Sequence, residues 1–128
     1  MSKKVLFINK VSTASVIPDV LSGIGCEVTG AFDDDTALHR LEYRAYDLII
    51  LVENPGAESW AFCTSIRRMT SAPLIVISSG ASAESCVKAI DAGADFFLRK
   101  PFGPMELTAR INALFQRTPV SQPVQLVS

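Results

Sequence analysis

The chain has 128 residues, with 12 basic and 13 acidic side chains, a formal net charge of −1 and a hydrophobic share of 48%. This length fits one domain that buries its own core, and the composition excludes an intrinsically disordered chain. No apolar run approaches the ~18 residues that span a bilayer, and Val5–Ile8 is too short for the core of a signal peptide. We therefore expect a cytoplasmic domain without membrane contact. Its nearly balanced charge also argues against direct binding of nucleic acid.

Five apolar blocks recur along the chain and predict five strands. They are Val5–Ile8, Val28–Phe32, Leu48–Val52, Leu74–Ile77 and Phe96–Leu98. Continuous apolar runs of this length, rich in β-branched residues, are typical of strands that are buried on both faces. Such strands belong to a parallel sheet with helices above and below it.

The segments between these blocks have helical spacing. Pro18 falls inside the first segment, so we expect the helix within residues 12–24 to start late or to kink. The later helices are expected over Asp35–Leu41, over Trp60–Met69, between Ser82 and Gly93, and over Pro104–Arg117.

The helix expected between Ser82 and Gly93 has clear boundary signals. Ser82 is a suitable N-cap, and Gly93 is placed to stop the helix. From the spacing of its apolar residues we expect Val87 and Ile90 to face the core.

Five βα units in about 117 residues predict a doubly wound α/β domain of the flavodoxin-like type, with strand order 2-1-3-4-5. We assign residues 1–117 to this domain. Residues 118–128 include two prolines and no charged side chain, so we expect a linker or a disordered tail. Sites in such sheets lie at the carboxyl ends of the strands. The positions to inspect are Asn9-Lys10, Val52-Glu53-Asn54, Ser78-Ser79 and Lys100-Pro101.

The remaining chemically active residue types give no sign of a metal site or a cofactor site. Cys26, Cys63 and Cys86 are widely spaced and form no C-x-x-C pair, which favours buried reduced thiols over a disulfide or a metal site. We expect His39 to face solvent on the second helix. Trp60 is expected to pack in the core or at its rim rather than to form a ligand platform.

Three segments at the predicted strand ends resemble a bacterial response-regulator receiver domain of the CheY-like type. They are Tyr46–Leu51, Pro73–Ser79 and Ala89–Phe102, and the resemblance extends over about residues 3–117. The Gly-Ala-Asp and Lys-Pro-Phe motifs within the third segment, behind a strand that ends in serine, are the specific part of the signal.

The resemblance implies phosphoryl transfer to an aspartate at the end of the third strand. It also implies a Mg²⁺ ion held by that aspartate and by acids at the end of the first strand. A Ser or Thr after the fourth strand and a Lys after the fifth would contact the phosphoryl group. In such a site the carboxylate is the nucleophile, while the metal and the lysine neutralise the charge on the transferring oxygens.

This sequence departs from the family at the decisive positions. Val52 stands where the family spacing, counted from Asp47, places the phosphoacceptor, and a hydrocarbon cannot form an acyl phosphate. Asn9 and Lys10 replace the acidic pair. Mg²⁺ prefers several hard oxygen ligands, and this pair offers one amide oxygen at most. If Lys10 points inward, its ammonium repels a cation at ~4 Å with an energy of about 4 kcal/mol per unit charge at an effective dielectric of ~20. We therefore predict a degenerate pocket, a pseudo-receiver, that holds no metal.

Ser78 and Lys100 match the family, but without an acceptor aspartate we interpret them as structural polar groups. Ser78 would bond locally, and Lys100 would pair with a nearby carboxylate. Glu53 is the nearest carboxylate, and three interpretations stay open for it. It sits in solvent, it forms an ion pair with Lys10 or Lys100, or it serves as a substitute phosphoacceptor.

A dimer surface is also implied by the resemblance. In receivers joined to winged-helix DNA-binding domains, which this chain resembles most, the fourth helix, fifth strand and fifth helix form a symmetric dimer through charge pairs. Asp95, Glu106 and Arg110 match that set, with Lys88 as a candidate substitute for the usual basic residue of the fourth helix. Phe97 replaces the tyrosine that changes rotamer in the family.

These observations predict a non-enzymatic receiver that acts without phosphorylation in two-component or phosphorelay signalling. We expect it to bind a protein partner or a second copy through the dimer surface, as part of a transcription regulator. Two alternatives stay open. One is a receiver that is phosphorylated on an unusual acceptor such as Glu53. The other is a sensor in which Lys10, Lys100 and Ser78 hold a small anion in the vacated pocket.

Overall fold

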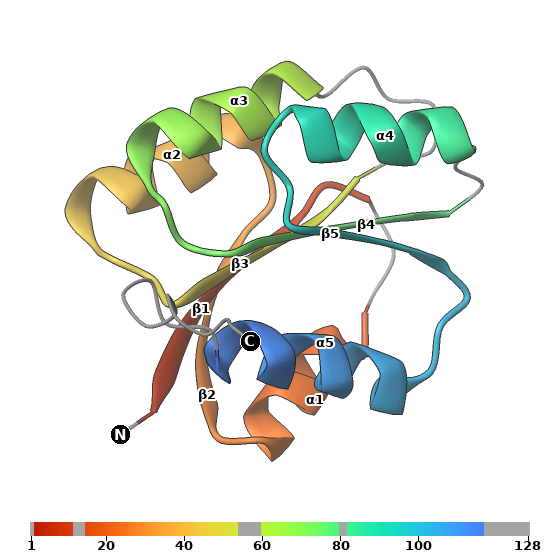
Figure 1. Ribbon diagram of the computed structural model, residues 1–128. Coiled ribbons are helices and arrows are strands. Elements are labelled where there is room, and N and C mark those ends of the chain that lie inside the picture. The colour runs from red at the N-terminus through yellow and green to blue at the C-terminus, as the bar shows by residue number, and fades with distance from the viewer. Residues whose placement is uncertain (1, 12–14, 54–59, 80–81, 117–128) are drawn as a thin grey trace, which may run out of the picture.

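A five-stranded parallel sheet forms the centre of the computed structural model, which describes residues 2–11, 15–53, 60–79 and 82–116 (Figure 1). The strands are β1 (Lys3–Asn9), β2 (Cys26–Ala31), β3 (Leu48–Val52), β4 (Leu74–Ser79) and β5 (Phe96–Lys100). Their order in the sheet is β2-β1-β3-β4-β5. This arrangement confirms the predicted doubly wound fold and its strand order.

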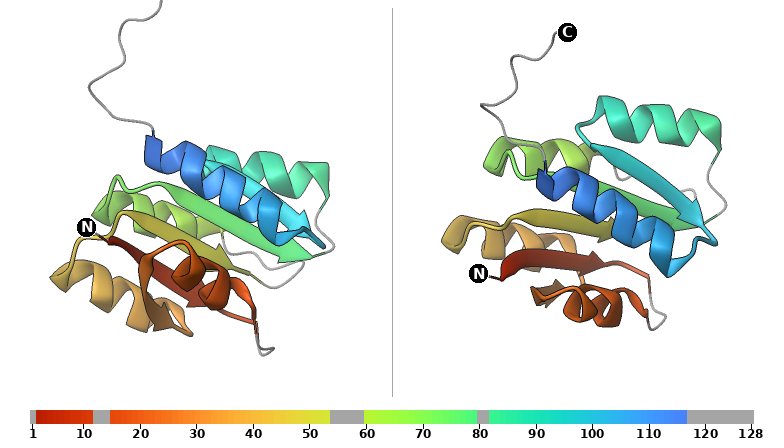
Figure 2. Two further views of the ribbon diagram at one scale, coloured as in Figure 1. Left: turned by 90° about the horizontal axis from the view of Figure 1, so that it is seen from below. Right: turned by 60° about the horizontal axis from the view of Figure 1, so that its bottom comes forward.

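Helices cover both faces of the sheet. They are α1 (Ile17–Gly23), α2 (Asp34–Tyr43), α3 (Trp60–Met69), α4 (Ala83–Asp91) and α5 (Pro104–Gln116). Figures 1 and 2 show α2, α3 and α4 on one face and α1 and α5 on the other. No helix within the described ranges is long and apolar enough to cross a bilayer. Residues 118–128, assigned from the sequence to a linker or tail, lie outside the described residues.

Side chains that alternate along the strands belong to two hydrophobic clusters, one on each face of the sheet. Leu6 and Ile8 of β1 pack toward α2, α3 and α4, whereas Val5 and Phe7 pack toward α1 and α5. All residues of β3 are at most 1% exposed. Full burial of one aliphatic side chain contributes about 1.5–3 kcal/mol. Burial on both faces explains why the central strands β1, β3 and β4 contain uninterrupted apolar runs.

The boundaries of the first elements differ slightly from the prediction. Helix α1 starts late, as expected, because Pro18 lies in its first turn, where a missing N–H costs little. β2 ends at Ala31, so Phe32, which was expected inside the strand, is 76% exposed. Helix α2 starts earlier than predicted, since the Asp33 side chain accepts a hydrogen bond from the Thr36 N–H at 2.7 Å and caps the helix.

The inward face predicted for α4 is wrong. Ser82 caps the helix as expected, accepting a hydrogen bond from the Ser85 N–H at 3.1 Å. However, Val87 is 58% exposed and Ile90 is 41% exposed, while Ala89 is fully buried. The helix packs on its neighbours through this small residue, which turns its larger apolar side chains outward.

Arg67 of α3 links its helix to the turn between α4 and β5. Its guanidinium donates hydrogen bonds to the Ala72 and Gly93 carbonyls at 2.7 Å and to the Asp95 carboxylate at 2.9 Å. The same carboxylate oxygen accepts the Leu74 N–H at 2.8 Å. Gly93 has a φ of 123°, a conformation that suits glycine, and it leaves room for the arginine stem.

The three cysteines are free thiols, as expected, but only Cys63 is buried. Cys26 and Cys86 are half-buried, which corrects the expectation that all three lie in the core. Burial raises the pKa of Cys63 to about 11, and the nearby Glu53 carboxylate adds to this increase. Cys63 is therefore a neutral thiol at physiological pH.

Candidate functional site

The parallel register brings the ends of three strands to one edge of the sheet. Asn9 is opposite Val52, and Val52 is opposite Ile77. Beyond the ladder, the Lys10 N–H donates to the Val52 carbonyl and the Glu53 N–H donates to the Ile77 carbonyl, both at 2.9 Å. These bonds fix the backbone on which the predicted pocket residues stand.

Lys10 points inward and lies between two carboxylates. Its Nζ is 2.6 Å from Oδ1 of Asp34 and 3.1 Å from Oε2 of Glu53. The same ammonium lies 4.9 Å from the centre of the Phe62 ring, within range of a cation–π contact. We call Lys10, Asp34 and Glu53 the ion triad.

The ion triad bears on two of the three interpretations of Glu53, the solvent-exposed side chain and the ion pair. With only 3% of its surface exposed, Glu53 does not sit in solvent. It pairs with Lys10 rather than with Lys100, which has no carboxylate within 4.0 Å in the part of the chain that the structure describes.

Electrostatics keep the Lys10 ammonium charged. Burial alone lowers the pKa of Lys10, but hydrogen bonds and Coulomb attraction from Asp34 and Glu53 outweigh this loss and raise the pKa above the ordinary value of 10.5. The ammonium thus places a permanent positive charge at this edge of the sheet.

The residues at this edge do not fit the Mg²⁺ ion that the receiver resemblance implies. Val52 is 1% exposed and packs in the cluster that also contains Ile77 and Leu98. The Asn9 amide oxygen accepts the Val11 N–H at 3.2 Å. The carboxylates of Asp34 and Glu53 face an ammonium, which repels a second cation. A magnesium ion would need these oxygens and would meet that repulsion.

Ser78 and Lys100, the two predicted pocket residues that match the family, lie in the last parts of β4 and β5. Ser78 Oγ bonds locally, donating to the Ser79 carbonyl at 3.4 Å, as the structural interpretation expected. Lys100 lines a separate groove of about 500 Å³ with Ser79 and Phe102. Neither Lys10 nor Ser78 is among the described residues that line this groove.

A second groove, of about 580 Å³, lies between α4, β5 and α5, where the dimer surface was predicted. Its lining includes Val87 of α4, Phe96 and Phe97 of β5, and Glu106 and Arg110 of α5. β5 is an edge strand of the sheet, and Figure 1 shows α4 and α5 on the two faces of the sheet.

The charges of the predicted dimer surface are partly engaged within the chain. Asp95 pairs with Arg67 at 2.9 Å, and Lys88 pairs with Glu84 of its own helix at 3.4 Å. The Arg110 guanidinium lies 5.0 Å from the centre of the Phe96 ring. Asp95 therefore has a structural role that the sequence analysis did not anticipate.

Sequence reasoning also missed Asp34 and Phe62, two of the groups around the Lys10 ammonium. The run Asp33-Asp34-Asp35 carried a signal, because it directly precedes a helix that starts beside the end of a strand. Acids are common at a helix N-terminus for electrostatic reasons alone, so the run did not by itself indicate an ion pair with Lys10.

The fold is a doubly wound domain whose candidate site lies at the carboxyl ends of the strands. Comparison with known proteins identifies the family that has this fold. The family model for the response regulator receiver domain matches residues 9–112. The receiver domain of NtrX from Brucella abortus superimposes with a TM-score of 0.79 at 27% identity, over 89% of this chain and 99% of that one. A putative response regulator from Chloroflexus aurantiacus gives a TM-score of 0.81 at 25% identity, over 91% of this chain and all of that one.

Two curated relatives are regulators. The probable transcriptional regulator ycf27 of Cyanophora paradoxa is 31% identical over 118 residues, which are 91% of this chain and 49% of that protein. The response regulator ArlR of Staphylococcus aureus is 36% identical over 89 residues, which are 69% of this chain and 41% of that protein. The chain belongs to the response regulator receiver domain family. It spans about half the length, or less, of these curated relatives.

Proposed function

We propose that this receiver domain signals without aspartyl phosphorylation, as a non-enzymatic protein-interaction or dimerisation module of a cytoplasmic transcription regulator. The observation that carries the proposal is the inward-pointing Lys10 ammonium between Asp34 and Glu53, where relatives would hold a metal ion. Val52, buried at the acceptor position, supports it further.

In an ordinary receiver, phosphorylation brings negative phosphoryl oxygens next to a divalent cation. In this domain the ion triad instead brings two carboxylates next to the Lys10 ammonium. An ordinary receiver pocket needs a divalent cation to neutralise the transferring oxygens. In this pocket the Lys10 ammonium, a cation that belongs to the chain itself, already neutralises the charge of the carboxylates. A Mg²⁺ ion at ~4 Å from the ammonium would meet a repulsion of roughly 8 kcal/mol at an effective dielectric of ~20. We infer that the domain rests in one conformation, and that a protein partner changes it.

Mass spectrometry after incubation with acetyl phosphate and Mg²⁺ tests the proposal. We expect no mass gain, and a matched reaction with an ordinary receiver verifies the reagent. A stable phosphoryl adduct would overturn the proposal. If that adduct disappeared in Glu53→Gln, the unusual acceptor would be Glu53.

The interaction surface that we propose is the groove between α4, β5 and α5. Exposed Val87 and Ile90 offer apolar area beside it, and Glu106 and Arg110 supply charges of both signs. A surface with both signs can meet a second copy of itself across a two-fold axis. Individual surface ion pairs contribute under about 1 kcal/mol, so the apolar contacts would provide most of the affinity.

Sedimentation velocity of Val87→Ser and Phe32→Ser tests this surface. Both side chains are more than half exposed, but Phe32 lies between β2 and α2, away from the groove. We expect Val87→Ser to weaken self-association or partner binding and Phe32→Ser to leave it unchanged. Equal behaviour of the two variants would reject the α4-β5-α5 surface.

A further inference from the structure

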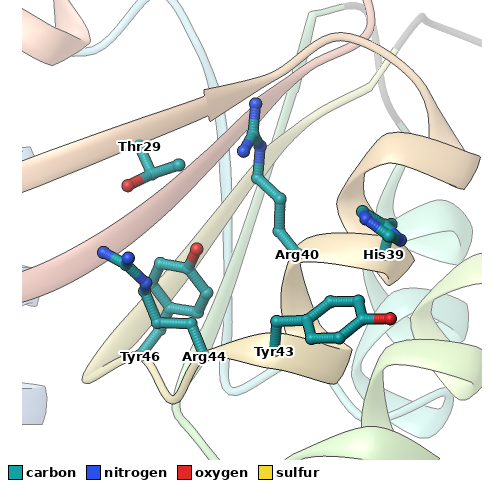
Figure 3. Close-up of a pocket in the computed structure, with 6 residues that line it drawn as sticks. All are labelled: Thr29, His39, Arg40, Tyr43, Arg44 and Tyr46. Atoms are coloured by element: carbon teal, nitrogen blue, oxygen red, sulfur yellow. The ribbon is translucent and has the colours of Figure 1, made fainter.

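A hollow of about 350 Å³ lies on the outer side of α2, away from the ion triad. It is lined by residues of β2, of α2 and of the segment before β3, namely Thr29, His39, Arg40, Tyr43, Arg44 and Tyr46 (Figure 3). Basic and hydroxyl-bearing side chains make up this lining, which contains no acidic residue.

Two guanidinium groups, those of Arg40 and Arg44, line this hollow. Arg40 Nε donates a hydrogen bond to the Gly30 carbonyl at 2.9 Å, which orients the group and leaves its two terminal nitrogens available. Arg44 follows the last turn of α2, and Figure 3 shows its guanidinium beside the Tyr46 ring, whereas the Arg40 guanidinium extends to β2. Among the described residues, neither arginine has a carboxylate within 4.0 Å.

Hydroxyl groups complete the donor set. Tyr46 is 8% exposed, so its ring is anchored in the core, and in Figure 3 its hydroxyl points toward the space beside the two arginines. Thr29 presents its side chain from β2 across the same space. Tyr43, 76% exposed, contacts the ring of His39 edge-on at 4.8 Å and forms an aromatic rim.

We propose that this hollow binds a small phosphate-bearing molecule. Guanidinium forks recognise phosphate oxygens through paired charge-assisted hydrogen bonds, and hydroxyl donors satisfy the remaining oxygens. The volume is within the usual range for small-molecule sites. Because no carboxylate of the described residues pairs with Arg40 or Arg44, binding of a dianion gains Coulomb energy without breaking an ion pair that the structure describes. The site does not depend on the degenerate strand-end pocket.

The chain contains two tyrosines, and both line the hollow, so their ring resonances report on it directly. We would titrate the full chain at low ionic strength with inorganic phosphate, pyrophosphate and AMP, which separates a phosphate, a diphosphate and a nucleotide as the source of the group. Saturable shifts of both tyrosine rings are expected with at least one of them, with a dissociation constant of about 1 mM or below.

Two arginine variants distinguish a site from general charge attraction. Arg44→Ala should weaken binding at least about tenfold, because one charge-assisted fork is lost. Arg68→Ala removes an equal charge from the exposed surface of α3 and should leave binding unchanged. Tyr46→Phe keeps the buried ring and should weaken binding about threefold through loss of the hydroxyl.

Three results would overturn the proposal. The first is the absence of saturable tyrosine shifts with all three compounds up to ~10 mM. The second is equal weakening by Arg44→Ala and Arg68→Ala, which would indicate nonspecific attraction. The third is a loss of thermal stability in Arg44→Ala with unchanged phosphate affinity, which would assign the arginine to stabilising the end of α2.

Discussion

Replacing Lys10 by methionine should destabilise the domain by about 3 kcal/mol. Methionine retains most of the apolar stem but removes the ammonium that faces Asp34 and Glu53. At 3.1 Å and an effective dielectric of ~20, the attraction between Lys10 and Glu53 alone is roughly 5 kcal/mol. Part of this attraction compensates for the burial of both groups. The Asp34 side chain is 46% exposed, so its share is smaller.

Urea unfolding of the wild type, Lys10→Met and Lys10→Met/Glu53→Gln provides the assay. The single variant leaves a buried carboxylate facing a hydrocarbon, whereas the double variant removes that charge as well. We therefore expect the double variant to recover more than half of the loss. Lys4→Met is the matched control, because the Lys4–Glu27 pair is exposed and 3.7 Å long, and it should cost under about 0.5 kcal/mol.

The pH dependence gives an independent check on Lys10. Its pKa is raised in the folded state, so its contribution is fully present below the unfolded value of 10.5 and is lost only as pH rises through the higher folded value. The difference between wild type and Lys10→Met should stay constant between about pH 7 and about pH 9. A Lys10→Met cost below about 0.5 kcal/mol, or a double variant as unstable as the single one, would refute the ion triad as a buried electrostatic unit.

Three further predictions concern the packing around Arg67 and Cys63. Arg67→Ala should lower the free energy of unfolding by about 2–3 kcal/mol in urea, because the Ala72 and Gly93 carbonyls lose their arginine donor and the Asp95 carboxylate loses its cationic partner. The exposed neighbour Arg68→Ala should change it by under about 0.5 kcal/mol. Gly93→Ala should lower the free energy of unfolding, measured by thermal unfolding, by at least about 2 kcal/mol. The new methyl would collide with the Arg67 stem, and the φ of 123° is strained for alanine. Gly23→Ala meets open space and should be nearly neutral, so equal effects of the two variants would contradict the steric argument. At pH 9, alkylation of Cys63 by iodoacetamide, followed by peptide mass spectrometry, should be at least about fifty times slower in the folded chain than in urea. Its pKa of about 11 leaves about 1% thiolate, and the buried thiol is also shielded from the reagent; equal rates would show that the thiol is not buried.

The fold followed from the sequence because the central strands β1, β3 and β4 are buried on both faces. The runs Leu48–Val52 and Leu74–Ile77 contain only apolar residues, and each of these two runs is followed by a polar residue. Periodicity was less informative for α4. A stripe through Val87 and Ile90 describes an amphipathic helix, but it does not say whether the apolar side meets the core or forms an exposed surface.

The pocket was predictable only in part. The substitutions at Asn9, Lys10 and Val52 can be read directly from the family spacing. The partner Asp34 cannot, because it comes from a helix that meets the strand end only after β1 and β2 pair in register. For Asp95 the sequence position was informative, but the role of the side chain was not. Its position matches a family dimer residue, but Arg67, far away in sequence, binds the carboxylate within the chain.

The central claim is that Lys10 supplies the cation of this pocket. The most direct measurement is a two-dimensional ¹H–¹⁵N NMR titration of the wild type with Mg²⁺ and beryllium fluoride, a mimic of the aspartyl phosphate. The account predicts no saturable shifts at Lys10, Val52, Glu53 and Ser78. Saturable, Mg²⁺-dependent shifts at these residues would contradict it.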